Sequence, residues 1–102
     1  MPVIQYTLRA RRDLKEIGTY IAAERPEAAD RVLDAISRTV HRLSHTRHIG
    51  QLCDELSPGL RRFPVMRYPY VVYFRPLTSG IRVIRVVHGS RDAARLRLDD
   101  EE

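Results

Sequence analysis

Two consecutive β-strand patterns joined by a short turn constrain this chain more than any other feature. Residues 67–75, RYPYVVYFR, are rich in aromatic and β-branched side chains, and residues 81–88, IRVIRVVH, form a second such run. The linker 76–80 ends in Ser-Gly, so the two runs predict a β-hairpin. Residues 60–65 predict a further strand, which Pro64 assigns to a sheet edge or a bulge. Strict alternation along the last strand predicts one face made of Ile81, Val83, Arg85 and Val87.

The first half of the chain carries helical periodicity instead. Apolar residues recur at three- and four-residue spacing through residues 8–24, and again from Pro26 to about His45. The residue before a proline is disfavoured in a helix, whereas proline suits a first helical position. Arg25-Pro26 therefore predicts a tight junction between two antiparallel helices. Residues 2–7 have β-formers and predict a short strand before the first helix.

This order predicts an α+β fold, β-α-α-β-β-β, in which a helical hairpin packs on a small, mainly antiparallel sheet. A chain of 102 residues is long enough for one core. We expect residues 1–92 to form a single domain and residues 93–102 to form an exposed tail.

Charge and cysteine content limit the classes of function. The net charge is +5, but residues 99–102 are all acidic, so residues 1–98 carry +9. A basic surface suggests nucleic acid, a nucleic-acid-bound machine or an acidic partner, although arginines dispersed on helix faces are also common on solvated surfaces. A single cysteine, Cys53, permits no intramolecular disulfide and no zinc site built on cysteines. We expect no metal and no cofactor.

The chain has neither a membrane-spanning apolar run nor an apolar signal-peptide core at its start. We therefore expect a cytoplasmic protein with no membrane partner.

Five ordered segments resemble the ParE branch of the ParE/RelE superfamily, the toxins of bacterial type II toxin–antitoxin modules. They are RRDLKEIGTYIA (11–22), RPEAADRVLDAI (25–36), LSPGLRRFPV (56–65), YPYVVYFR (68–75) and VIRVVHGSRD (83–92). The resemblance covers about residues 3–92. No single segment is diagnostic, but their ordered combination is specific, and it implies the same fold that the patterns predict.

The RelE-like branch of this superfamily consists of ribosome-dependent mRNA endonucleases. Metal-free RNA cleavage requires a base, an acid and a cation on the phosphate within hydrogen-bond reach of one another. The candidates here are Glu55, Arg62, His88 and Arg91. The match is poor, because Gly89 stands where such relatives can carry a tyrosine and Pro64 interrupts the strand next to Arg62. A lone histidine at a strand end is also often structural.

The ParE branch is the better match, and the resemblance implies inhibition of DNA gyrase by binding, with no catalytic residue. The polar segment after the last strand is the predicted target contact, through His88, Ser90, Arg91 and Asp92. A local role is the alternative, with Asp92 pairing with Arg91 or Arg95, or capping a short helix. A degenerate, non-toxic member of the family is a third possibility.

The resemblance also implies a cognate, ParD-like antitoxin, with which the chain would form a hetero-oligomer. A disordered antitoxin segment that folds on binding can wrap a large basic surface. The predicted contacts are Arg9, Arg11, Arg12, Arg38, Tyr68, Tyr70 and Tyr73. Aromatic side chains often anchor such interfaces, although core and cross-strand packing is the alternative for the tyrosines.

Overall fold

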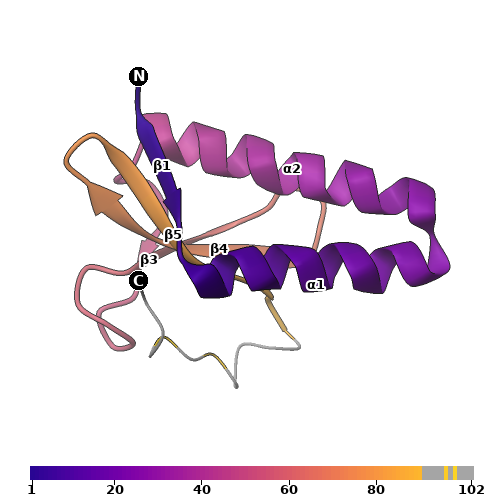
Figure 1. The fold of residues 1–102 in the computed structure, drawn as a ribbon. Coiled ribbons are helices and arrows are strands. Elements are labelled where there is room, and N and C mark those ends of the chain that lie inside the picture. Colours follow the sequence, from indigo (N-terminus) through magenta and orange to yellow (C-terminus); the bar gives the residue numbers. More distant parts are fainter. Residues whose placement is uncertain (91–95, 97, 99–102) are drawn as a thin grey trace.

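A computed structural model describes residues 1–90, 96 and 98. Two helices lie side by side as an antiparallel hairpin against one sheet (Figure 1). The elements are β1 (Val3–Tyr6), α1 (Leu8–Glu24), α2 (Pro26–His45), β2 (Gln51–Leu52), β3 (Arg61–Pro64), β4 (Tyr70–Leu77) and β5 (Gly80–His88). The predicted fold class, a helical hairpin on a small and mainly antiparallel sheet, is confirmed.

Local chemistry explains where both helices begin and end. The Thr7 hydroxyl caps α1 by accepting the Ala10 N–H at 3.0 Å. Arg25 is non-helical, with φ −140° and ψ 83°, and Pro26 opens α2 directly after it. The Arg25 N–H donates to the Ile21 carbonyl oxygen at 2.8 Å, which closes the last turn of α1. The predicted bounds of both helices are confirmed.

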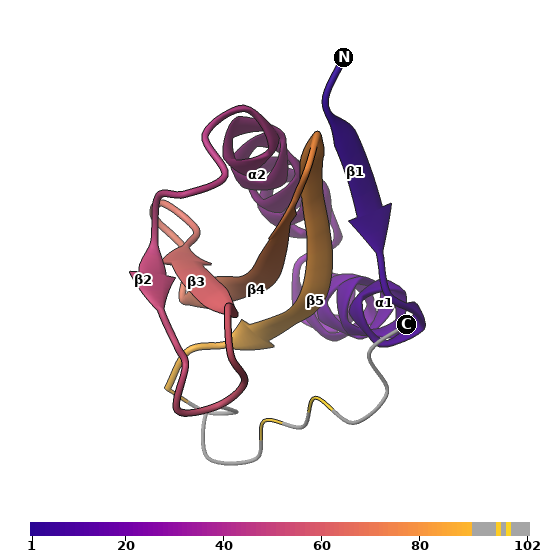
Figure 2. The same cartoon turned by 90° about the vertical axis from the view of Figure 1, so that its left-hand side faces the viewer.

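The sheet has the strand order β1-β5-β4-β3-β2 (Figure 2). β1 pairs with β5 in parallel, whereas the other neighbours are antiparallel. The two-residue β2 was not predicted, because so short a strand leaves no periodicity in the sequence. β2 pairs only with Arg61 and Arg62 of β3. Pro64 pairs with Val71 of β4 but has no β2 residue opposite it, so its missing N–H leaves no ladder bond unmade on the β2 side.

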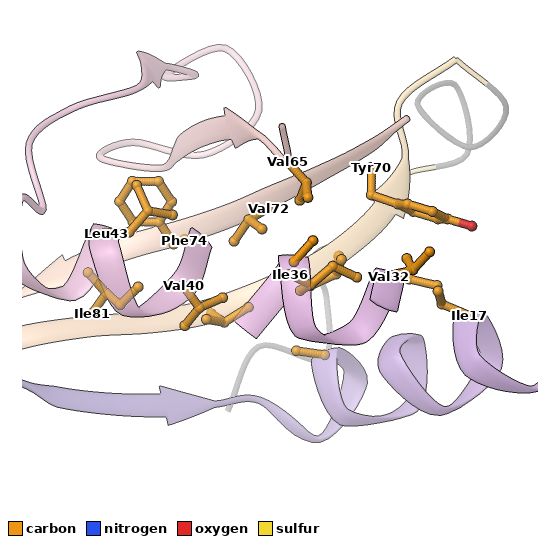
Figure 3. Close-up of a cluster of buried hydrophobic side chains, with 14 residues drawn as sticks. Ile17, Val32, Ile36, Val40, Leu43, Val65, Tyr70, Val72, Phe74 and Ile81 are labelled. Carbon is orange, nitrogen blue, oxygen red and sulfur yellow. The ribbon is translucent and has the colours of Figure 1, made fainter. Parts of the chain in front are cut away.

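Apolar side chains form two clusters, one on each face of the sheet. The larger cluster lies between the sheet and the helices, and Figure 3 shows Ile36 and Val40 of α2 near Val72 and Phe74 of β4, with Ile17 of α1 beside Val32. The second cluster lies on the face that the helices do not cover. It contains Cys53, Leu60, Tyr73, Ile84 and Val87, with Val71, Leu96 and Leu98 packed against it. The sheet therefore buries apolar surface on both sides.

A β-bulge in the central hairpin changes the side-chain alternation of β5. Tyr73 pairs with Arg85 and Phe74 pairs with Val83, so Ile84 has no partner of its own. The extra residue exchanges the two faces along the rest of the strand. The predicted strict alternation is wrong for this reason: Val86 packs in the helix-side cluster with Val83, whereas Val87 packs on the opposite face.

The described part of the predicted tail, residues 93–102, is limited to Leu96 and Leu98. Both side chains are half-buried against the second cluster. The other tail residues lie outside the described residues, so the predicted division into a domain and a tail stays a prediction.

Candidate functional site

A buried ion pair joins the first helix to the last strand. Asp13 of α1 is 4% exposed and Arg85 of β5 is 6% exposed. Arg85 donates from Nε to Asp13 Oδ2 at 2.7 Å and from Nη2 to Oδ1 at 3.1 Å. The same carboxylate accepts the Val86 N–H at 2.9 Å, and Arg9 Nε lies 3.7 Å from Oδ1. Because a bidentate guanidinium–carboxylate pair fixes orientation as well as distance, it positions α1 against the end of β5.

A polar hollow of about 210 Å³ lies beside this pair, between α1 and the end of the β4–β5 hairpin. Arg9, Glu16 and Tyr20 contribute from α1, and Tyr70 and His88 contribute from paired positions of β4 and β5. The Tyr70 and His88 rings meet edge to face, with centroids 5.6 Å apart and planes at 79°. The hollow thus presents charges of both signs, a phenol group and an imidazole to a partner.

Two of the four predicted target contacts lie together at the end of β5. Ser90 Oγ is 3.4 Å from His88 Nδ1, and Ser90 is exposed. Gly89 between them donates its N–H to the Pro69 carbonyl oxygen at 2.7 Å, and a Cβ there would lie 3.1 Å from Val71 Cγ2. The chain therefore turns closely around the start of β4. Arg91 and Asp92 lie outside the described residues, so their role, and the local alternative, stay predictions.

The four candidate nuclease residues are not brought together by the described part of the fold. Arg62 pairs with Tyr73, which belongs to the cluster on the helix-free face. His88 pairs with Tyr70, which belongs to the helix-side cluster. Since directly paired residues on neighbouring strands share a face, Arg62 and His88 lie on opposite faces of the sheet.

The electrostatics of Arg62 agree with this separation. A hydrogen bond with the Tyr73 side chain is the main cause that raises the Arg62 pKa, and the nearby Glu55 charge adds to it. Arg62 Nε also donates to Gln51 Oε1 at 3.1 Å. Arg62 and Glu55 are thus neighbours away from His88, and Arg91 lies outside the described residues.

The predicted antitoxin contacts differ in their surroundings. Arg11 and Arg12 are exposed on α1, and the Arg11 guanidinium carbon lies 6.0 Å from the centroid of the Tyr6 ring. Burial of that ring raises the Tyr6 pKa, which the Arg11 charge partly offsets. Arg9 is half-buried beside Asp13.

The remaining predicted antitoxin contacts separate into a surface pair and a core pair. Arg38 and Tyr68 line one groove between α2 and the β3–β4 turn. Tyr70 and Tyr73 are only 5% and 2% exposed and belong to the two apolar clusters. An antitoxin could reach the faces of these two rings only if neighbouring side chains moved.

Sequence reasoning missed Asp13, and it placed Arg85 on one face of the last strand. The signal was present, because Asp13 lies three residues after Ala10 and four before Ile17, both on the buried stripe of α1. An acid on the apolar face of a helix requires a buried partner. A basic residue within a buried strand, such as Arg85, is the complementary signal.

Among the described residues, no three His, Cys, Asp or Glu side chains are close enough to hold a metal ion. Neither helix in this part of the chain is both long and apolar enough to cross a bilayer.

Comparisons with known proteins point in one direction. The model of the family described as "ParE toxin of type II toxin-antitoxin system, parDE" matches residues 4–93. A candidate toxin of Sinorhizobium fredii, Y4kP, is 33% identical over 89 residues, which cover 83% of this chain and 85% of that protein. A structure described as the chromosomal ParDE TA system from P. aeruginosa matches with a TM-score of 0.74 at 24% identity, over 86% of this chain and 96% of the other.

The structural match, at 24% identity, shows the fold alone. The family match begins at residue 4, within β1, and continues past the end of β5, so it includes both described helices. This chain therefore belongs to the ParE toxin family of type II toxin–antitoxin systems.

Proposed function

We propose that this ParE-family toxin inhibits DNA gyrase by binding it, and that it thereby blocks replication in the cytoplasm until a cognate, ParD-like antitoxin neutralises it. One observation carries the choice of binding over bond cleavage. Arg62 and His88, which a nuclease would need around one phosphate, lie on opposite faces of the sheet. General acid–base catalysis requires such groups within about 3 Å of the atoms that exchange protons.

The end of β5 is the proposed contact with the target. His88 lines a hollow whose floor includes the buried Asp13–Arg85 pair, and Ser90 Oγ lies 3.4 Å from His88 Nδ1. A floor held by a bidentate ion pair needs little reorganisation when a partner docks on it, and pre-organised surfaces bind more tightly for that reason. Arg91 and Asp92 extend this contact in the proposal.

Purified toxin is tested against purified gyrase by measuring DNA supercoiling and the accumulation of cleaved DNA. We expect inhibition by the wild-type chain and relief on addition of the antitoxin. The variant His88→Ala/Ser90→Ala is expected to raise the half-inhibitory concentration about tenfold, typical of interface hot spots. Thr78→Ala is the matched control, because Thr78 is exposed in the turn at the opposite end of the same hairpin. It should inhibit like the wild type.

A parallel assay follows mRNA integrity in a translating extract. Intact transcripts are the expected result. Transcript cleavage that His88→Ala reduces by roughly 100-fold or more, together with unaffected gyrase, would replace the proposal with the nuclease alternative. If expression without the antitoxin leaves growth unchanged and gyrase is unaffected, the chain is a non-toxic member of the family.

A further inference from the structure

Charge is segregated along this chain in a way that the net value hides. Residues 1–34 contain six basic and six acidic residues, so this part is neutral. Residues 35–90 contain nine arginines but only two acids, Asp54 and Glu55, which gives a net charge of +7. The second half of α2 and most of the sheet therefore carry the positive charge, whereas α1 and the first half of α2 do not.

A groove of about 350 Å³ between α2 and the β3–β4 turn collects part of this charge. Arg38 and Arg42 line it from α2, and Arg67 lines it from the turn. None of the described residues that line the groove is acidic. We call this surface the arginine groove.

Two of its guanidinium groups are available to a partner. Arg38 and Arg67 are exposed, and neither makes a hydrogen bond or an ion pair with any described residue. Arg42 lies over the Phe63 ring at 5.6 Å, which orients its guanidinium group. Arg38 and Arg42 are one turn apart on α2, about 6 Å along the helix axis, which is close to the separation of adjacent phosphates along a nucleic-acid strand.

Arg67 also has an unusual backbone conformation. Its φ of 74° is in the left-handed region, where it is the single non-glycine residue in the described chain. Glycine and asparagine adopt this conformation at a lower free-energy cost than arginine does. Strained residues of this kind are concentrated at functional sites. The turn thus presents a long cationic side chain where a small residue would be better for folding alone.

We propose that the arginine groove binds the phosphate backbone of double-stranded DNA. A row of guanidinium groups in a groove whose described lining holds no acid matches a regularly spaced polyanion. Among the described residues that line the groove, Met66 is the one apolar side chain that is largely exposed, at 72%. Tyr68 is partly buried and packs against the core. This surface offers a single largely exposed apolar anchor, too few for an amphipathic acidic peptide, and a single half-buried ring, Tyr68, too few to stack successive bases of a single strand.

The test measures fluorescence anisotropy of a labelled mixed-sequence duplex titrated with the full chain, without gyrase, so its outcome is independent of the gyrase proposal. Three phosphate contacts predict that log K falls with log salt concentration with a slope of about −3. The variant Arg38→Gln/Arg67→Asn should reduce the magnitude of this slope by about two and weaken binding at least about tenfold near physiological salt. Asn at position 67 preserves the left-handed turn, and an unchanged melting temperature shows that the fold is intact.

The matched control is Arg25→Gln/Arg31→Gln. It removes the same charge from exposed positions at the N-terminal end of the same helix and should change the dissociation constant less than twofold. Three results would overturn the proposal: no salt-dependent binding to the duplex, equal weakening by both double variants, or tighter binding to single-stranded DNA. Displacement of the duplex by polyglutamate at equal charge concentration would also overturn it, and would indicate an acidic polypeptide as the partner.

Discussion

Replacing Asp13 with alanine should destabilise the protein more than most single substitutions. The change removes the carboxylate that accepts two Arg85 hydrogen bonds and one from the Val86 N–H, at a site where both charged side chains are nearly inaccessible. Breaking one side of a buried ion pair costs about 3–5 kcal/mol, and an unsatisfied backbone N–H accounts for about 1–3 kcal/mol of such a loss. We therefore expect a decrease of about 4 kcal/mol in the free energy of unfolding.

Urea unfolding followed by circular dichroism measures this loss. With an m value of about 1.5 kcal/mol per molar urea, a loss of about 4 kcal/mol moves the midpoint down by roughly 2–3 M. Domains of this size have only about 5–15 kcal/mol of stability, so part of the variant population should be unfolded without denaturant. Asp13→Asn keeps an acceptor for the Val86 N–H and should lose about half as much. The exposed Arg12→Ala should stay within about 0.5 kcal/mol of the wild type.

A double-mutant cycle tests the reasoning itself. Arg85→Met alone leaves the Asp13 carboxylate buried without its bidentate partner, and Asp13→Leu alone removes the carboxylate that faces the Arg85 guanidinium group. Asp13→Leu/Arg85→Met leaves neither charge. The double variant should be less destabilised than the sum of the singles by about 2 kcal/mol or more. If Asp13→Ala loses less than about 1 kcal/mol, or the single losses simply add, the pair does not hold α1 to β5 as argued.

Three further outcomes follow from other contacts. Gly80→Ala should detach β1, because its Cβ would lie 1.8 Å from the Val3 carbonyl oxygen, and melting should show a loss of more than about 2 kcal/mol. Leu98→Ser should lose about 1 kcal/mol and speed alkylation of Cys53, because it uncovers their shared cluster; an unchanged alkylation rate would contradict this. Burial raises the Cys53 pKa above its usual 9.0, and the Glu55 charge raises it further. The protonated thiol therefore stabilises the fold below that pH, and this contribution to stability is lost as the pH rises through the folded-state pKa. Urea midpoints measured at increasing pH should fall above about pH 9, and less steeply in Glu55→Gln.

Local sequence signals predicted the helices well because those signals are strong and complete within each segment. The apolar stripes run for the whole of α1 and α2, and the Arg25-Pro26 junction marks their common boundary. The β4–β5 hairpin was predictable for the same reason, although Pro76 lies inside β4 rather than in the linker. It pairs with Ile81 near the end of the strand, where a missing N–H is tolerated.

Features that depend on distant parts of the chain were not predictable from patterns. The bulge at Tyr73/Phe74 inserts one residue without any glycine to mark it, so alternation failed after Ile84. β2 exists only because β3 offers it a partner. In the candidate site, the proximity of His88 and Ser90 follows from sequence adjacency. The Asp13–Arg85 pair spans 72 residues and needed the fold to bring it together.

The parallel pairing of β1 with β5 has a consequence for how the toxin is made. Among the described strands β1 pairs only with β5, and the Thr7 hydroxyl donates to the Ile84 carbonyl oxygen 77 residues later. During synthesis β1, α1 and α2 emerge before the strands that cover them, so β1 lacks its partner strand and Asp13 lacks Arg85, and the helices can pack only on each other and on β1. Since such long-range closure is slow and must wait for β5, a nascent chain cannot complete the sheet before β5 has emerged. The architecture itself thus withholds the finished fold until β5 has been made.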